Sequence, residues 1–333
     1  HIFLITAEGI NAENMSLYGY DRKTTPFLDT LSATSLVAQN AFTNSGNTSG
    51  SIISILTSKS PIETRVLYPP DILQGDDAFQ HLPGILRSNG YYTAQFSLDH
   101  YVDAYQLNIR NGFDEANGRS AQGFFIQRLN NWLPANISYF IYDMGYRMID
   151  RLQHIFFIRQ MSDPYADVNS PEEYEDLSKL NSVLNLLDSK DQPVFAHVHW
   201  MGTHGLQFYP ETQVFSAGRS PDFQGDWDTD FYDDSILEFD QAMGEFYAEL
   251  ENRGFADQSI LIITSDHGQQ WTTDYRLPLL IRFPNGEHHS NLIANTQNMD
   301  VIPTILDYLG LDIPPWTNGS SMIDGFPQER PIY

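Results

Sequence analysis

Short apolar runs alternate with amphipathic segments along most of this 333-residue chain, and this alternation restricts the fold more than any other feature. Runs that predict strands cover residues 2–6, 91–98, 193–200, 259–265 and 277–283. Segments with the apolar spacing of helices cover residues 24–39, 48–56, 77–89, 233–253 and 300–309. Strands that alternate with helices predict an α/β fold, with a central, mainly parallel sheet and helices on both faces.

The length suits one large domain, and we expect residues 1–333 to form a single unit. One part of it is less regular. Residues 120–165 are apolar and aromatic with scattered arginines, and they predict a helical insertion. Helices packed on the domain are one interpretation of this insertion, and an amphipathic patch that faces a membrane or a partner is the other.

The charge of the chain restricts what it can bind. Lysine and arginine number 18, aspartate and glutamate number 43, and the formal charge is therefore −25. Such a chain repels polyanions, so we exclude nucleic acid as a partner. An anionic substrate would need a local positive centre, which a bound metal ion can supply. A solvated acidic surface that keeps a secreted protein soluble also accounts for most of the charge.

Cysteine does not occur in the chain, which excludes disulfides, thiolate metal ligands and a cysteine nucleophile. No run of about 18 apolar residues predicts a transmembrane helix, and no signal peptide is recognisable. The sequence nevertheless opens directly on the apolar strand at residues 2–6. A natural protein rarely begins within a strand, so we expect an earlier segment, which can hold a membrane anchor.

The strand at residues 259–265 ends in Asp266, His267 and Gly268. The backbone turns at the end of a strand, so this carboxylate and this imidazole can converge on one ion. Carboxylate oxygen with imidazole nitrogen suits Zn²⁺ or Mn²⁺, and Ca²⁺ or Mg²⁺ are the alternatives. An Asp-His pair alone indicates a metal site only weakly, and its position between a buried strand and a glycine strengthens that interpretation.

Glu8 directly follows the first predicted strand. The carboxyl ends of parallel strands meet at one edge of a sheet, where α/β proteins bind ligands, so Glu8 can complete a metal site with Asp266. A solvated loop glutamate is the alternative interpretation.

A turn of small polar residues, 45–51, leads into the second predicted helix. We expect Thr48 near the N-terminus of that helix, where free backbone N–H groups and the helix dipole favour an anion. A metal-bound hydroxyl at this position loses its proton more easily and becomes a nucleophile. The same residues also suit a plain helix N-cap.

Three histidines lie on or after the strand at residues 193–200. His197 and His199 share one face of that strand, so at least one of them can be a packed side chain. His204 lies in a loop flanked by glycines, where an imidazole can bind a substrate oxyanion or protonate a leaving group. We expect His204 to be catalytic, and His199 and His204 to bind substrate.

The four segments described above, around Asp266 and His267, Glu8, Thr48 and His204, together resemble those of the alkaline phosphatase/sulfatase superfamily. The resemblance extends over almost the whole chain. Residues 232–240 look like the helix that precedes the Asp-His-Gly strand in that superfamily. Residues 276–284 and 300–306 look like its following strand and its late helix. The resemblance implies an alkaline phosphatase-like fold.

Within the superfamily, the chain is most similar to the phosphoethanolamine and phosphoglycerol transferases of bacterial envelopes. Their glutamate ligand stands in a pattern like G-E-S-x-R-A-E-N-x-S-L-x-G-Y, and residues 7–20 read A-E-G-I-N-A-E-N-M-S-L-Y-G-Y. Their G-S-H-G-P loop is similar to residues 202–206. The resemblance implies one divalent metal ion and a threonine nucleophile. The metal ligands that it implies are Glu8, Thr48, Asp266 and His267, and it implies that His204 contacts the phosphate.

Two departures from known patterns matter. Sulfatases carry a C/S-x-P-x-R motif that yields formylglycine, whereas residues 48–52 read T-S-G-S-I. The expected ester is therefore a phosphate rather than a sulfate. The transferases usually carry another histidine after Asp-His-Gly, and residues 269–274 contain none.

These features predict a metal-dependent phosphotransferase or phosphodiester hydrolase that acts through Thr48. The resemblance implies envelope lipid or glycan phosphoesters as substrates, on the periplasmic or extracellular face of the cell membrane. A hydrolase of another ester within the sulfatase family and a non-catalytic scaffold domain are the alternatives. A serine hydrolase with a Ser-His-Asp triad is excluded, because no G-x-S-x-G occurs in the chain.

Overall fold

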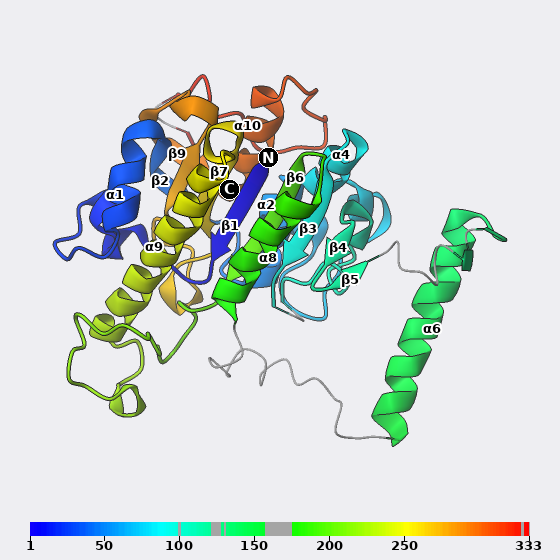
Figure 1. Cartoon of the computed structure of the whole chain (residues 1–333), viewed down its shortest axis with the longest axis horizontal. Helices are drawn as coiled ribbons and strands as arrows, with labels where there is room; N and C mark the ends of the chain where they lie inside the picture. The colour runs from blue at the N-terminus through cyan, green and yellow to red at the C-terminus, as the bar shows by residue number, and fades with distance from the viewer. Residues whose placement is uncertain (99–100, 121–127, 130, 157–174, 328–329, 333) are drawn as a thin grey trace.

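The computed structural model describes residues 1–98, 101–120, 128–129, 131–156, 175–327 and 330–332. A nine-stranded sheet lies at the centre of these residues, in the order β5-β4-β3-β6-β1-β7-β8-β2-β9 (Figure 1). The strands are β1 (Ile2–Ala7), β2 (Leu36–Phe42), β3 (Tyr92–Phe96), β4 (Glu115–Ala116), β5 (Arg119–Ser120), β6 (Val194–Trp200), β7 (Ile260–Ser265), β8 (Leu279–Arg282) and β9 (Ser290–Gln297).

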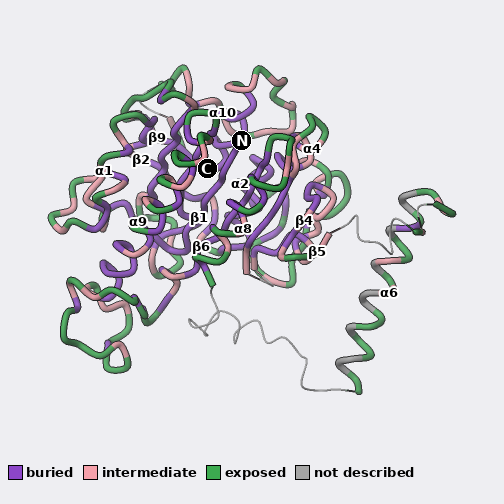
Figure 2. Tube along the Cα trace, viewed as in Figure 1, coloured by how far each residue is buried: buried purple, intermediate pink, exposed green. Residues whose placement is uncertain are grey.

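Helices cover both faces of the sheet. The helices of the described residues are α1 (Pro26–Leu31), α2 (Thr48–Thr57), α3 (Pro61–Thr64), α4 (Leu82–Ser88), α6 (Ala135–Phe156), α8 (Asp176–Ser189), α9 (Thr229–Asn252) and α10 (Val301–Tyr308), of which α6 lies apart from the sheet. Helices α1, α8 and α9 contribute buried residues to one core cluster, and α2, α4 and α10 contribute to a second. Figure 2 shows the sheet buried between these layers.

Strand β1 lies in the middle of the sheet and pairs in parallel with β6 on one side and β7 on the other. Its side chains alternate between the two cores, as a buried parallel strand requires. Phe3 and Ile5 join the core under α8 and α9, whereas Ile2 and Leu4 join the core under α2 and α10. The predicted α/β fold, with a mainly parallel sheet and helices on both faces, is confirmed.

The prediction of one helix over residues 24–39 is wrong. Helix α1 ends at Leu31, and β2 begins at Leu36. The Ser35 hydroxyl donates to the carbonyl of Leu31 at 2.8 Å. Local bonds of this kind compete with continuation of a helix. Leu36 and Val37 instead pair with strands β8 and β9, and their burial in the sheet overrides the helical spacing.

Two further predictions hold only in part. Residues 77–89 form a short 3₁₀ turn, η4 (Gly75–Phe79), and then α4. The His81 ring caps α4 by accepting the N–H of Gly84 at 3.0 Å, so the helix begins later than its apolar spacing indicates. Strand β8 is present, but it runs antiparallel to both β7 and β2.

Helix α6 occupies the part of the predicted insertion that the structure describes. Residues 121–127, 130 and 157–165 of that insertion lie outside the described residues. Apolar side chains of α6 are exposed, among them Phe140 at 61% and Ile149 at 57%. No helix in the described part of the chain has both the length and the hydropathy that crossing a bilayer requires. Whether α6 faces a membrane or a partner stays a prediction.

Candidate active site

The register of the central strands brings Glu8 and Asp266 to the same edge of the sheet. Ala7, the last residue of β1, lies opposite Trp200 of β6 and Ser265 of β7. The N–H of Glu8 donates to the carbonyl of Trp200 at 3.0 Å, and the N–H of Asp266 donates to the carbonyl of Ala7 at 3.1 Å. The expectation that the two carboxylates meet at one sheet edge agrees with this geometry.

The turn after β1 is fixed by its neighbours. Gly9 has a φ of +64°, a left-handed conformation that favours glycine. The Tyr232 hydroxyl donates to the carbonyl of Gly9 at 2.8 Å and accepts the N–H of Asn11 at 2.9 Å. The Thr203 hydroxyl donates to the carbonyl of Glu8 at 2.6 Å. These bonds hold the backbone of Glu8 from both sides.

Helix α2 presents its first residue to the same point. Thr48 opens α2, as the sequence predicts, and all ten residues of the helix are buried. The Ser51 hydroxyl, one turn later, donates to the backbone carbonyl of Asp266. This bond ties the start of α2 to the end of β7. The free N–H groups of the first turn therefore face the site, where they favour negative charge.

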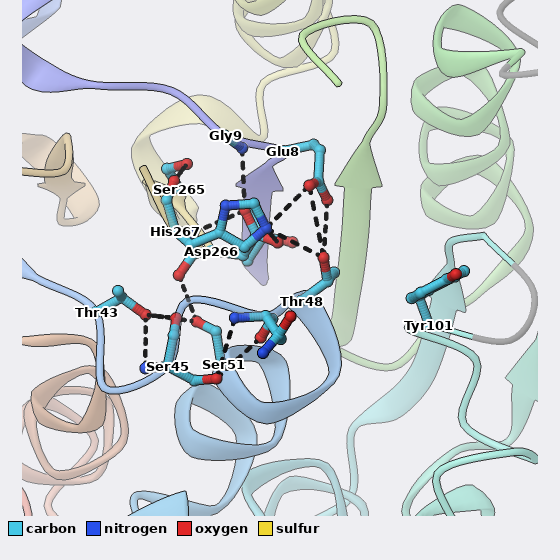
Figure 3. Close-up of polar contacts among 12 residues, drawn as sticks. Glu8, Gly9, Thr43, Ser45, Thr48, Ser51, Tyr101, Ser265, Asp266 and His267 are labelled. Carbon is cyan, nitrogen blue, oxygen red and sulfur yellow. Dashed lines mark hydrogen bonds and ion pairs between the residues drawn. The ribbon is translucent and has the colours of Figure 1, made fainter. Parts of the chain in front are cut away.

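Four side chains converge between β1, β7 and α2 (Figure 3). The Thr48 hydroxyl lies 3.2 Å from Glu8 Oε2 and 3.2 Å from His267 Nε2. His267 Nε2 lies 3.0 Å from Glu8 Oε1 and 3.4 Å from Asp266 Oδ2. One potential ligand atom each from Glu8, Asp266 and His267 lies within 4.8 Å of the other two. The structure thus brings together all four residues for which the sequence predicts metal binding.

The unused donor atoms of this cluster suit a cation. Asp266 Oδ1 accepts the N–H groups of Gly9 at 3.1 Å and of His267 at 2.8 Å. Asp266 Oδ2 is buried and, among the described residues, has no hydrogen-bond partner. His267 Nδ1 lies 2.9 Å from the carbonyl of Gly268, which only an N–H at Nδ1 can satisfy. The lone pair of Nε2 is then free to bind a metal ion.

Mutual electrostatics keep this cluster charged. Burial would raise the pKa of Glu8, but attraction to His267 and hydrogen bonds from His199 and His267 hold that pKa well below its ordinary value. Burial, and then repulsion by Glu8, raise the pKa of Asp266 to about 6. Burial would lower the pKa of His267, but Asp266 and Glu8 raise it to about 10. Without a metal ion, a proton on His267 balances the two carboxylates.

His204 lies in the loop that follows β6. Asp176, the first residue of α8, accepts the N–H groups of Met201 at 2.9 Å and Gly202 at 2.8 Å, which anchors the start of that loop. The backbone N–H of His204 donates to the carbonyl of Met201 at 2.8 Å. Burial lowers the pKa of the His204 imidazole. Sequence reasoning missed Asp176, although its position at the start of a helix is a signal for a capping role.

The two strand histidines lie deeper than His204. His199 is fully buried, and its Nε2 lies 3.2 Å from Glu8 Oε2 while its Nδ1 lies 2.8 Å from the Thr6 hydroxyl. His197 is also fully buried and contacts Thr6 and Gln95. Sequence reasoning missed Thr6 and Gln95, because an interior threonine and glutamine give no signal for a site.

The loop after Gly268 carries Trp271, whereas the transferases that the chain resembles usually carry a histidine in this loop. Trp271 is 44% exposed and lies edge-on to Trp227, with ring centroids 5.1 Å apart. Its ring centroid is 6.3 Å from that of His204. The backbone of Trp271 packs so closely on Gly46 that a Cβ at Gly46 would approach the Trp271 carbonyl oxygen to 2.5 Å. This contact joins the loop to the turn that precedes Thr48.

Curated relatives match parts of this chain. The multifunctional alkaline phosphatase superfamily protein PehA of Trinickia caryophylli is 30% identical over 110 residues, which are 29% of this chain and 21% of that protein. The ulvan-active sulfatase of Formosa agariphila is 22% identical over 317 residues, 90% of this chain and 59% of that protein. Lipoteichoic acid synthase 1 of Bacillus subtilis is 29% identical over 154 residues, 40% of this chain and 23% of that protein. The chain thus matches less than two thirds of the length of each.

The fold and the family agree with one another. The solved structure of the phosphonate monoester hydrolase of Agrobacterium radiobacter has a TM-score of 0.64 at 17% identity, and the match covers 98% of this chain and 78% of that one. This likeness confirms the alkaline phosphatase-like fold. A family model described as Sulfatase matches residues 1–311. The chain therefore belongs to the sulfatase family, within the alkaline phosphatase superfamily of ester-hydrolysing enzymes.

Proposed function

We propose that this chain is a metal-dependent enzyme that transfers or hydrolyses phosphoesters through Thr48. One observation carries the proposal: the Thr48 hydroxyl lies 3.2 Å from both Glu8 Oε2 and His267 Nε2, at the start of a buried helix. A hydroxyl in contact with a carboxylate and an imidazole that can bind metal has the surroundings of an activated nucleophile.

One divalent cation would be held by Glu8, Asp266 and His267, with Thr48 as a further ligand. Asp266 Oδ2 has no hydrogen-bond partner among the described residues, and the contact of His267 Nδ1 with the carbonyl of Gly268 leaves Nε2 as the nitrogen for a metal ion. Both observations support this assignment. The mixed oxygen and nitrogen donors suit Zn²⁺ or Mn²⁺, and Ca²⁺ or Mg²⁺ are the alternatives. When bound, the cation would lower the pKa of the Thr48 hydroxyl and neutralise charge on the phosphate.

The proposed reaction consists of two displacements at phosphorus. In the first, a bond forms between Thr48 Oγ1 and phosphorus, the ester bond to the alcohol breaks, and the proton that threonine loses ends on the departing alcohol. In the second, the oxygen of water or of a substrate hydroxyl forms a bond to phosphorus, the bond from phosphorus to Thr48 Oγ1 breaks, and the proton that the attacking group loses ends on Thr48 Oγ1. The N–H groups at the start of α2 would stabilise the negative charge that develops on the phosphoryl oxygens.

His204 would contact the substrate, as the resemblance implies. Burial lowers the pKa of its imidazole, so the ring is neutral near pH 7. A neutral imidazole can donate a hydrogen bond to a phosphoryl oxygen, or pass a proton to the leaving group, without adding a second fixed cation. Asp176 supports this role because it anchors the loop in which His204 lies.

We propose lipid-linked or glycan-linked phosphoesters of the cell envelope as substrates. Similarity to lipoteichoic acid synthase 1 over 40% of this chain supports this class. The same similarity supports a site of action on the periplasmic or extracellular face of the membrane.

Sulfate-ester hydrolysis is a second candidate function. The Sulfatase family model and the similarity to the ulvan-active sulfatase over 90% of this chain favour it. Against it stands the nucleophile position, where residues 48–52 read T-S-G-S-I and cysteine does not occur. Formylglycine cannot form from threonine by the route open to cysteine and serine, so phosphate remains the preferred ester.

The test compares a chromogenic phosphodiester with the matching aryl sulfate in the presence of Zn²⁺ or Mn²⁺. We expect turnover of the phosphodiester by the wild type and a loss of at least about 1,000-fold in Thr48→Ala. Ser54→Ala is the matched control, because it removes a hydroxyl that is buried in the same helix and, among the described residues, donates to the carbonyl of Gly50 alone. That control should keep the wild-type rate.

Two results would contradict the proposal. Unchanged turnover in Thr48→Ala would remove the threonine nucleophile, and faster cleavage of the aryl sulfate would transfer the assignment to the sulfatases. A wild type that binds the metal ion but cleaves neither ester would instead support a scaffold domain on this fold.

A further inference from the structure

A continuous series of buried hydrogen bonds leads from strand β3 through β6 and β1 to Glu8. Its members, in order, are Gln95, His197, Thr6, His199 and Glu8. The first four are fully buried, and Glu8 is 2% exposed. The series crosses three neighbouring strands of the sheet, and the proposed reaction uses only its last member.

The backbone sets the direction of the first bond. The N–H of Ala104 donates to Gln95 Oε1 at 2.7 Å, so the other end of the amide must be the NH₂ group. Gln95 Nε2 then donates to the carbonyl of Val102 at 2.9 Å and lies 3.2 Å from His197 Nδ1. Since an NH₂ group has no lone pair to offer, His197 Nδ1 is the acceptor.

This first bond determines the tautomer of His197. Burial lowers the pKa of His197 to about 3, so the ring is neutral and carries one proton. With Nδ1 as an acceptor, that proton is on Nε2, which donates to the Thr6 hydroxyl oxygen at 3.0 Å.

The Thr6 hydroxyl in turn determines which ring nitrogen of His199 carries the proton. Its oxygen already accepts from His197, and its proton points to His199 Nδ1, 2.8 Å away, in preference to the carbonyl of Val198 at 3.4 Å. His199 Nδ1 is therefore an acceptor, and the ring proton is on Nε2. That N–H donates to Glu8 Oε2 at 3.2 Å.

We propose that Thr6, His197 and Gln95 are positioning residues that keep His199 as a hydrogen-bond donor to Glu8. The inference rests on the proposed metal site. Glu8 Oε2 accepts from His199 and also contacts the Thr48 hydroxyl, so Oε1, 3.0 Å from His267 Nε2, would be the oxygen that binds the cation. His199 presents an N–H instead of a lone pair, so it orients the carboxylate and does not become a ligand itself. This role replaces the substrate contact expected for His199 from the sequence.

Partners behind a metal ligand tune affinity because they fix its orientation and its basicity. A hydrogen-bonded carboxylate loses little freedom when it binds an ion, whereas a carboxylate free to rotate must be ordered at that moment. The first four members of the series are fully buried in the sheet, so solvent has little access to their donors. Its direction is thus set by the fold and not by the bound ion.

The test removes the link at Thr6 without changing its shape. Thr6→Val deletes the hydroxyl, and Thr6→Ser restores it. Thr93→Val is the matched control, because Thr93 is equally buried on β3 and its hydroxyl bonds to Asp114 alone. Zn²⁺ affinity is measured by competition with a chelator. The protonated nitrogen of His199 is read by nitrogen NMR of the metal-free protein.

We expect Thr6→Val to bind Zn²⁺ about 10–100-fold more weakly than the wild type, as is typical of partners behind a metal ligand. The metal-free variant should also lose the single Nε2–H signature of His199. Thr6→Ser and Thr93→Val should match the wild type in both measurements. If Thr6→Val does not fold, Gln95→Met applies the same test two links further from the metal, with a smaller loss of affinity.

Three results would overturn the inference: equal affinity and tautomer in Thr6→Val and wild type, equal losses in Thr6→Ser and Thr6→Val, or an Nδ1–H on His199 in the wild type. These outcomes differ from a failure of the proposed function. A wild type that binds no Zn²⁺ would remove the metal site, while the NMR of the metal-free protein would still report the direction of the series.

Discussion

Asp234 and Asp266 are both fully buried aspartates, and they differ in how many partners they have. The carboxylate of Asp234 accepts four hydrogen bonds, from the N–H groups of Val214 at 2.8 Å, Phe215 at 2.8 Å and Ser216 at 2.9 Å and from the Ser216 hydroxyl at 2.6 Å. Asp266 accepts two bonds on Oδ1, and its Oδ2 has no partner among the described residues.

We interpret this difference as that between a structural carboxylate, Asp234, and a proposed metal ligand, Asp266. Asp234 has used its lone pairs to hold the loop at residues 214–216 against α9, so it has nothing left to offer an ion. Asp266 remains buried with one free oxygen, a state that costs free energy unless a cation completes it. Burial raises the pKa of Asp266 to about 6, which is consistent with that cost. Burial is common to both aspartates, and the oxygen without a hydrogen-bond partner is what supports Asp266 as the proposed ligand.

The largest expected effect follows from removing the free oxygen. Asp266→Ala should weaken binding of Zn²⁺ or Mn²⁺ by at least about 1,000-fold, which corresponds to about 4 kcal/mol. It should abolish phosphodiester turnover as well. Equilibrium dialysis with metal analysis of the retained protein measures the affinity. Binding within tenfold of the wild type would show that the free oxygen is not a ligand.

Substitution of Asp234 should have the opposite effects: lower stability and unchanged metal affinity. Asp234→Ala leaves three backbone N–H groups and one hydroxyl without their acceptor, so we expect the free energy of unfolding to fall by about 3 kcal/mol. Affinity for the metal ion should stay at the wild-type value, because the four hydrogen bonds of the Asp234 carboxylate all go to residues 214–216. Urea unfolding of the metal-free proteins checks the first value, and dialysis checks the second. A loss of metal binding in this variant would erase the distinction between the two aspartates.

The smallest expected effect is a pH dependence of the metal-free protein. Glu8 and Asp266 raise the pKa of His267 to about 10, above the ordinary value of about 6.5 for an unfolded chain. The stability that protonated His267 contributes is therefore complete below about pH 6.5 and is lost as the pH rises through about 10. Thermal unfolding between pH 7 and pH 10 measures the slope.

Two variants, Asp266→Ala and Asp234→Asn, test whether this pH dependence comes from the metal-ligand cluster. Asp266→Ala removes one of the two carboxylates that hold the proton on His267, so the slope should become shallower. Asp234→Asn should keep the wild-type slope. Saturation with the metal ion should also flatten it, because the ion replaces the proton on His267. A metal-free wild type without a slope would contradict the proton that the geometry assigns to His267.

Much of this site could be predicted from the sequence, because the groups that matter stand at chain positions with a physical signature. Glu8 and Asp266 each follow directly after a buried parallel strand, and Thr48 opens an apolar helix. Strand ends and helix starts are where an α/β sheet presents polar groups to a ligand. The same reasoning predicted the fold class, since β1, β6 and β7 are largely apolar and fully buried.

The rest depends on contacts that a pattern does not contain. Strand β2 carries helical spacing and becomes a strand only because β8 and β9 pair with it. Thr6 and Gln95 look like ordinary strand residues until the register puts them beside His199 and His197. Asp234 and Asp266 cannot be ranked from the sequence, because partner count is a property of the folded chain.

The central claim is that Glu8, Asp266 and His267 bind one divalent cation beside Thr48. The most direct measurement is anomalous diffraction from crystals of the protein grown with Zn²⁺ or Mn²⁺. The account predicts a single strong peak within about 2.0–2.3 Å of the free Asp266 oxygen, Glu8 and His267 Nε2. A chain saturated with the ion but without a peak at this position, or with its peak at Asp234, would contradict it.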